Sequence, residues 1–184
     1  MNRRGKSSSN GKAKHGSGLS NGLYDQPGHL IRRAQQIAVS MFYSTMGYDV
    51  TPVQYAVLRI LEDNPGIDQV TLARLCALDT STAANLAVRL EARGLVKRVV
   101  PAKSKRFRML HLTPRGLGLV EELLRSERLV SRRLMQSLAE KEQKIFLRLL
   151  KKFVHLNNEN SRAPLHRAST GAKSNHSTAG ATLA

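Results

Sequence analysis

The chain has 184 residues, of which 41% are apolar and 23% charged, and its net charge is +17. This length leaves room for one compact domain of roughly 100–150 residues plus loose ends. No apolar run approaches the ~20 residues that a membrane helix needs, and a single cysteine, Cys76, provides no disulfide framework. The basic N-terminus lacks the apolar core of a secretory signal, so we expect a cytoplasmic protein.

The positive charge extends beyond the ends of the chain. Residues 1–24 contribute +5 and residues 157–184 contribute +2, which leaves +10 on the middle of the chain. A charge of this size usually indicates a polyanionic partner, which is nucleic acid or, less often, an anionic membrane surface. Both ends are rich in small polar residues, so we expect disordered tails over residues 1–25 and 157–184. These tails are either solvated linkers or cationic arms that add non-specific affinity for DNA.

Proline and glycine mark the first two helices. Pro27 opens a helix in which apolar residues recur at helical spacing, and Gly47 marks its end. Thr51 followed by Pro52 indicates a second start, because a hydroxyl side chain caps a helix and proline fits its first turn. The apolar stripe of this second helix stops at Asn64, which precedes Pro-Gly.

A short third helix, from about Gln69 to Cys76, precedes a fourth helix that begins at residues 79–81 and ends before Gly94. One face of the fourth helix is apolar, at the spacing i, i+3, i+4 and i+7. The opposite face carries small or planar hydrogen-bonding groups, namely Ser81, Thr82, Asn85 and Arg89. Asparagine can pair with adenine and arginine with guanine, so this face is typical of a DNA-reading helix. The alternative is an ordinary exposed helix face with a Ser/Thr cap.

Two short strands, at residues 95–100 and 108–112, flank a basic loop. This hairpin carries six cations and no acid, namely Lys97, Arg98, Lys103, Lys105, Arg106 and Arg108. An unpaired run of charge repels itself and gains most from phosphate, so we expect the hairpin to grip the DNA backbone. The residues that we expect to contact DNA are Lys103, Lys105, Arg106 and Arg108. The alternative is a solvated charged face.

Two long apolar-striped helical segments follow, starting at Thr113-Pro114 and at Ala139. They are too long to bury their apolar faces against so small a core, so we predict that they pack on a second copy of the chain. The predicted boundaries are 26–156 for the folded domain, 51–113 for its DNA-reading part, and 27–46 and 114–156 for its dimerisation helices.

Several short motifs follow one another along the chain. They are Thr51-Pro52-x-Gln54, Pro65-Gly66, Leu72-Ala73, Ser81-Thr82, Arg89-Leu90-Glu91-x-x-Gly94-Leu95-Val96-x-Arg98 and Leu112-Thr113-Pro114-x-Gly116. As an ordered set, spanning about residues 28–156, they resemble the MarR family of bacterial winged-helix regulators. The resemblance implies a mainly α fold with a small β wing, a winged helix-turn-helix with N- and C-terminal dimerisation helices. It also implies a homodimer that binds pseudo-palindromic operators and, in most members, represses until a small molecule binds.

Two features refine this resemblance. Residues 24–33 and 66–69 look like the regulators of aromatic-compound breakdown, which implies a small aromatic acid or its CoA thioester as effector. The family wing usually has an Asp where this chain has Ser104, and an acid is common where it has Val88. Both changes remove negative charge near the DNA face, so we expect stronger and less discriminating attraction for phosphate, and a looser wing.

An aromatic carboxylate needs a cation for its charge and apolar walls for its ring. His29, Arg32 and Arg33 are candidates for the charge, and Tyr48 and Tyr55, with Met41, are candidates for the walls. The alternative is that these residues are surface charges and ordinary core aromatics.

The remaining sequence signals do not favour catalysis. Cys76 lies beside the apolar face of the third helix, where a free cysteine is usually packing. The six histidines form no metal-like cluster, and no nucleophile–base pair or phosphate-cradling loop is found, so we predict no metal, no cofactor and no enzyme activity. We interpret the chain as a ligand-responsive, sequence-specific regulator, and as a repressor. The alternatives are a low-specificity architectural DNA-binding protein and an adaptor whose long helices bind another protein.

Overall fold

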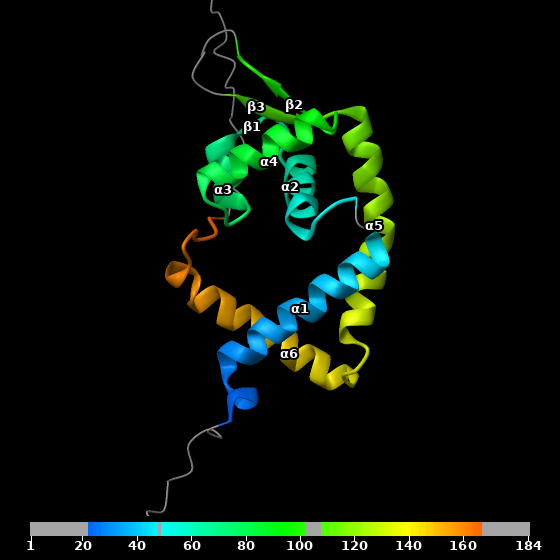
Figure 1. The fold of residues 1–184 in the computed structure, drawn as a ribbon, viewed down its shortest axis with the longest axis vertical. Helices are drawn as coiled ribbons and strands as arrows, with labels where there is room; N and C mark the ends of the chain where they lie inside the picture. Colours follow the sequence, from blue (N-terminus) through cyan, green and yellow to red (C-terminus); the bar gives the residue numbers. More distant parts are fainter. Residues whose placement is uncertain (1–21, 48, 102–107, 167–184) are drawn as a thin grey trace, which may run out of the picture. The chain divides into compact units, whose positions relative to one another are not determined.

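The computed structural model describes residues 22–47, 49–101 and 108–166 (Figure 1). In chain order its elements are η1 (Leu23–Asp25), α1 (Pro27–Met46), α2 (Pro52–Asp63), β1 (Ile67–Asp68), α3 (Gln69–Leu75), α4 (Thr80–Ala92), β2 (Val96–Val99), β3 (Met109–Leu112), α5 (Pro114–Met135), α6 (Glu140–Leu156) and η2 (Asn158–Asn160). The chain divides into two compact units, residues 1–40 and 41–184, so α1 crosses from one to the other. The mainly helical fold with a small β wing confirms the predicted fold class.

Helix starts follow from local capping chemistry. Thr51 Oγ1 accepts a hydrogen bond from the Gln54 N–H, and Gln54 Oε1 accepts one from the Thr51 N–H, both at 3.1 Å. This capping box satisfies two orphan groups at the start of α2. Thr113 Oγ1 likewise accepts from the Gly116 N–H at 3.0 Å and caps α5. The predicted starts at Pro52 and Pro114 are therefore confirmed.

The sheet has three antiparallel strands in the order β1-β3-β2. β2 pairs with β3, with Val96 opposite Leu112, and β1 pairs with the other edge of β3, with Ile67 opposite Leu110. The sequence pattern predicts only β2 and β3. β1 has two residues, too few for an alternating pattern to show.

The core joins α2, α3, α4, α5 and the sheet. Its fully buried side chains include Leu58, Leu61, Leu72, Leu90, Leu110 and Val120, each with under 2% of its surface exposed. Gly116 allows α5 to begin against this core, because a Cβ there would lie 2.1 Å from the Leu95 carbonyl oxygen. The first turn of α5 therefore needs a residue without a side chain.

Two polar contacts tie α5 to neighbouring helices in the unit of residues 41–184. The Tyr55 hydroxyl on α2 donates to Glu127 Oε2 at 2.8 Å. Arg133 Nη1 donates to Thr45 Oγ1, near the end of α1, at 2.9 Å. These contacts lie more than 70 residues apart in sequence, so only the fold brings their partners together.

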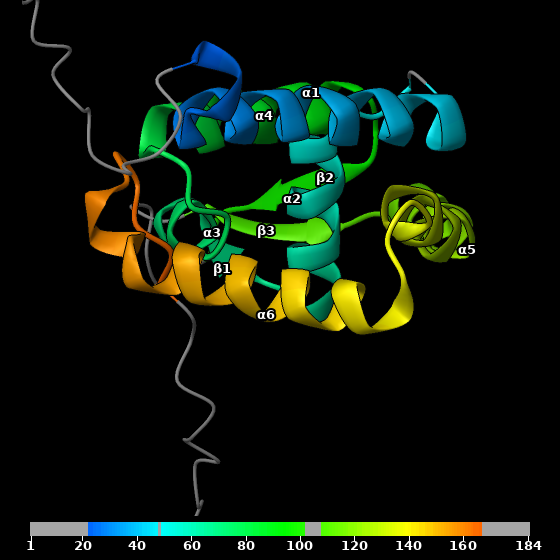
Figure 2. The same ribbon diagram turned by 90° about the horizontal axis from the view of Figure 1, so that it is seen from below.

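α6 leaves its apolar side chains in solvent. It turns back from the far end of α5 (Figures 1 and 2), and none of its residues is buried. Eight apolar side chains on α6 are at least 42% exposed in the single chain: Ile145, Phe146, Leu147, Leu149, Leu150, Phe153, Val154 and Leu156. Among the described residues, none of the helices combines the length and apolarity of a membrane span.

Candidate nucleic-acid interface

The candidate interface starts at the N-terminal end of α4. Asp79 is the N-cap, and its Oδ1 accepts a hydrogen bond from the Thr82 N–H at 2.8 Å. The hydroxyls of Ser81 and Thr82 also donate to the Asp79 carboxylate. These bonds hold the pKa of Asp79 well below its ordinary value, with the Ser81 hydroxyl as the largest cause. Ser81 and Thr82 therefore belong to the cap, and their hydroxyl hydrogens are already committed.

The two faces of α4 differ as the sequence pattern indicates. Ala83, Ala87 and Leu90 are buried against the core, each at most 1% exposed. Asn85 and Arg89 are exposed on the other side of the helix. The exposed face thus presents a planar amide and a guanidinium, which are the two groups best suited to pair with base edges.

An ion pair joins α4 to the wing. Arg98 on β2 pairs with Glu91 on α4 through its guanidinium, and the Arg98 N–H lies 3.3 Å from Glu91 Oε1. The hydrogen bond from Arg98 lowers the pKa of Glu91. The sequence pattern treats all six hairpin cations as unpaired, and for Arg98 this is wrong. Arg98, whose side chain is 19% exposed, therefore anchors β2 to α4.

The tip of the wing lies outside the described residues. Lys103, Lys105 and Arg106 belong to the segment 102–107, so their predicted DNA contacts stay predictions. Lys97 on β2 and Arg108 before β3 are described, and both are exposed. Arg108 thus directly adjoins the tip segment, whereas Lys97 lies near the start of β2, opposite His111.

The predicted effector residues fall in both units. His29, Arg32 and Arg33 lie on the part of α1 that belongs to residues 1–40, whereas Tyr55 belongs to the other unit. His29 makes an edge-on ring contact with Tyr24, with ring centroids 5.5 Å apart. Tyr48 lies outside the described residues.

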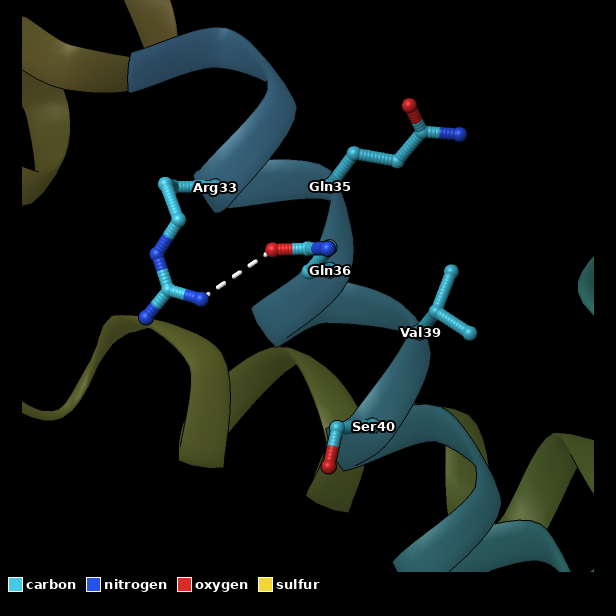
Figure 3. Close-up of a pocket in the computed structure, with 5 residues that line it drawn as sticks. All are labelled: Arg33, Gln35, Gln36, Val39 and Ser40. Atoms are coloured by element: carbon cyan, nitrogen blue, oxygen red, sulfur yellow. Dashed lines mark hydrogen bonds between the residues drawn. The ribbon is translucent and has the colours of Figure 1, made fainter. Parts of the chain in front are cut away.

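A shallow hollow on α1 contains one of these residues. Arg33, Gln35, Gln36, Val39 and Ser40 line it, all from a single helix (Figure 3). Arg33 Nη1 donates to Gln36 Oε1 at 3.0 Å, so the guanidinium is held along the helix surface. The hollow has a charged and an amide wall but no aromatic wall of its own.

Tyr55 has an internal role in the structure. Burial, together with its hydrogen bond to Glu127, raises the pKa of Tyr55. Its ring also lies 6.0 Å from the ring of Phe42, in a tilted arrangement. This environment agrees with the alternative interpretation of Tyr55 as a core aromatic.

Cys76 is half-buried, in agreement with the packing role that the sequence indicates. Burial raises the pKa of the Cys76 thiol to about 11, so the reactive thiolate is disfavoured at neutral pH. In the part of the chain that the structure describes, no three His, Cys, Asp or Glu side chains gather as metal ligands would.

Two contacts near the interface could not be found from sequence patterns. Arg93 Nη1 donates to the Asp49 carbonyl at 2.6 Å, which ties the end of α4 to the chain before α2. Arg162 Nη2, from beyond α6, lies 3.0 Å from Asp79 Oδ2. The sequence predicts a disordered tail from Asn157 on, but residues 158–166 of that segment are described and reach the cap of α4.

Sequence comparisons relate this chain to known regulators. A model of the MarR family matches residues 48–106. The transcriptional regulator HosA of Escherichia coli is 35% identical over 58% of this chain and 79% of HosA. The transcriptional repressor NicR of Pseudomonas putida is 31% identical over 74% of this chain and 89% of NicR.

Solved structures agree with these relatives. The PcaV regulator of Streptomyces coelicolor, solved with its natural ligand, has a TM-score of 0.69 at 33% identity and covers 74% of this chain and 96% of its own. BpsR of Bordetella bronchiseptica, whose DNA binding is regulated by 6-hydroxynicotinic acid, has a TM-score of 0.67 at 30% identity and covers 72% and 95%. The repressor CouR, solved on a 23-mer DNA duplex, has a TM-score of 0.64 at 26% identity and covers 72% and 94%.

Proposed function

Since the chain belongs to the MarR family of transcriptional regulators, we propose that it represses transcription by binding a pseudo-palindromic operator as a homodimer. The relatives include a repressor, NicR, and a repressor solved on duplex DNA, CouR. The observation that carries the proposal is the two-sided character of α4. Its apolar face is buried, and Asn85 and Arg89 are exposed on the other face. Such a helix can lie in the major groove while the core holds it from behind.

The residues around α4 then take distinct roles. Asn85 and Arg89 read base edges, by pairing with adenine and guanine. Ser81 and Thr82 shape the N-terminal end of the helix, where backbone N–H groups and the helix dipole favour phosphate. This division of roles follows from the hydrogen bonds of the cap, in which both hydroxyls are engaged with Asp79.

The wing supplies the non-specific part of the affinity. Lys103, Lys105, Arg106 and Arg108 are proposed to reach phosphates and the flanking minor groove. If two wings neutralise ~6–8 phosphates together, the affinity falls by roughly three to four decades between about 50 and 200 mM salt. The Arg98–Glu91 pair supports this role, because it anchors β2, the first strand of the wing, beside α4.

Dimerisation is assigned to residues 27–46 and 114–156, and DNA reading to residues 51–113. The exposed apolar side chains of α6 support the first assignment, since a contiguous apolar surface of this kind marks an interaction site. A two-fold dimer would present the two α4 helices to successive major grooves, ~34 Å apart.

The effector is proposed to be a small aromatic acid or its CoA thioester, with His29, Arg32 and Arg33 as the candidates that bind its carboxylate. BpsR supports this class of ligand, because 6-hydroxynicotinic acid is an aromatic acid. A melting-shift screen of aromatic acids and their CoA esters tests the proposal. A ligand at one hundred times its Kd stabilises by about 2.7 kcal/mol, which is readily detected.

A second candidate function is low-specificity architectural binding. The net charge of +17 and the absence of an acid at Val88 and Ser104 favour it. Competition between the promoter of the gene that encodes this chain and bulk genomic DNA separates the two functions. A specific regulator retains its promoter against excess genomic DNA at about 150 mM salt, whereas an architectural protein shows little preference.

A further inference from the structure

The chain beyond α6 folds back on itself. We call residues 158–166, which follow α6, the C-terminal strap. The Leu165 N–H donates to Asn158 Oδ1 at 2.8 Å, and Asn158 Nδ2 donates to the Leu165 carbonyl at 3.3 Å. These two hydrogen bonds between the Asn158 side chain and the Leu165 backbone close the strap into a loop.

The strap ends on the helix-turn-helix. Its last described residues approach α3 in both views (Figures 1 and 2). The His166 N–H donates to the Arg74 carbonyl at 3.1 Å, at the C-terminal end of α3, where the same carbonyl also accepts from the Ala77 N–H at 3.4 Å. Arg162 Nη2 lies 3.0 Å from Asp79 Oδ2, at the start of α4. The strap therefore contacts both sides of the turn between α3 and α4.

The contact changes the charge at the start of the reading helix. Asp79 is the one acidic residue between Gln69 and Leu90. Its carboxylate would repel a phosphate that approaches the N-terminal end of α4. Arg162 neutralises this charge, while 88% of its side chain remains exposed. Arginine offers five N–H donors in a planar fork, so donors remain for a second anion.

From this geometry we propose that the strap is part of the DNA-binding surface and that Arg162 donates to a backbone phosphate beside the start of α4. The inference rests on the proposed function. Its distinct content is a DNA contact from a segment that lies beyond the winged helix and beyond α6. The contact is with the backbone, so it adds affinity without base preference.

The test is the salt dependence of duplex binding by full-length wild type, Arg162→Ala and Arg162→Lys. Each lost phosphate contact reduces the slope of log K against log salt by about 0.9, so a dimer that lacks two contacts loses about 2. We expect Arg162→Ala to show this change, together with about tenfold weaker binding to operator and to random duplex alike. Arg162→Lys retains the positive charge and should keep most of the slope.

Lys141→Ala is the matched control. It also removes one positive charge per chain, but from the first turn of α6, at the opposite end of that helix from the strap. We expect its salt slope to equal that of wild type. Equal slope changes for Lys141→Ala and Arg162→Ala would mean that only the net charge matters, which would overturn the inference.

Other outcomes of these measurements would also overturn the inference. An unchanged slope for Arg162→Ala, with a lower melting temperature, would make Arg162 a purely structural partner of Asp79. Tighter DNA binding by Arg162→Ala would make the strap an inhibitory element. Either result overturns the inference alone. A wild-type chain that binds no duplex would instead overturn the proposed function, and the inference with it.

Discussion

At the scale of single residues, Asn85 carries the clearest test of base reading. It is exposed on α4, and replacing it with alanine removes a donor and an acceptor that together can pair with adenine. We expect Asn85→Ala to lose preference at one position of each half-site, by about 1–3 kcal/mol, and to bind mixed-sequence DNA almost as well as wild type. Sequencing of the bound fraction of a randomised operator library measures both effects.

Ser131→Ala serves as the control for Asn85→Ala, because Ser131 is an exposed polar residue on α5 rather than on α4. Its base preferences should match those of wild type. If Asn85→Ala also gives the wild-type profile, Asn85 does not read bases and the assignment is wrong.

Asp79 carries a prediction about pH. The Ser81 and Thr82 bonds, with Arg162, hold its pKa well below the ordinary value. A carboxyl whose pKa is lower in the folded state stabilises the fold above the unfolded pKa of about 3.9, and this stability is lost as the pH falls through the folded pKa. Asparagine also caps a helix but does not titrate.

We therefore expect the melting temperature of wild type to fall more steeply than that of Asp79→Asn between about pH 5 and pH 2. Thermal unfolding followed by circular dichroism across this range measures the difference. Parallel curves for the two proteins would show that the cap of α4 does not contribute to acid unfolding.

The residue scale also shows where sequence patterns end. The helical period separates Asn85 and Arg89 from the buried face of α4, so their exposure could be predicted. The Arg98–Glu91 pair could not, because seven residues and the Gly94 turn separate the partners and only the folded hairpin brings them together. Arg162 and Asp79 are 83 residues apart, so no local pattern connects them.

At the scale of elements, two glycines on α5 provide a matched pair. A Cβ at Gly116 would lie 2.1 Å from the Leu95 carbonyl oxygen, whereas nothing lies within 4 Å of a Cβ at Gly118. We expect Gly116→Ala to destabilise the fold by about 1–3 kcal/mol, because backbone must shift to admit the methyl group. Gly118→Ala should stabilise it by up to about 1 kcal/mol, because alanine favours the helical state.

Urea unfolding of both variants measures the sign and size of each change in the free energy of unfolding. A loss of stability of equal size in both would mean that helix propensity and the close contact at Gly116 do not determine the outcome. A neutral Gly116→Ala would show that the start of α5 can move away from Leu95.

The boundary of an element was predictable where a local capping motif sets it. Thr-Pro pairs mark the starts of α2 and α5, and both helices begin there. The end of α5 was less predictable. The apolar pattern extends this helix to Leu138, but α5 ends at Met135. α6 begins directly after Ala139, whose backbone N–H donates to Glu142 Oε2. Apolar residues continue through this corner, so periodicity alone does not locate the break.

At the scale of the whole molecule, the proposed dimer determines how DNA is read. In the proposed complex one α4 helix covers one half-site, and two half-sites ~34 Å apart need two helices at a fixed separation. The apolar side chains of α6 that are exposed in one chain are the surface available to fix that separation. DNA affinity and dimer formation should therefore be linked, since each copy adds the contacts of one half-site.

Phe153→Glu tests this linkage. Phe153 is 50% exposed on α6, and a charge at its position would be buried unpaired in a dimer interface, which is strongly unfavourable. We expect the variant to sediment as a single chain at micromolar concentration and to bind a full operator at least about tenfold more weakly, because one half-site alone holds it. Lys144→Glu is the control, since nine residues at ~100° per residue put it on the opposite side of the helix. It changes the charge more than Phe153→Glu does, yet should remain dimeric.

If both variants dissociate, charge rather than apolar contact controls assembly. If neither does, α6 is not the dimer interface and its exposed face binds another partner.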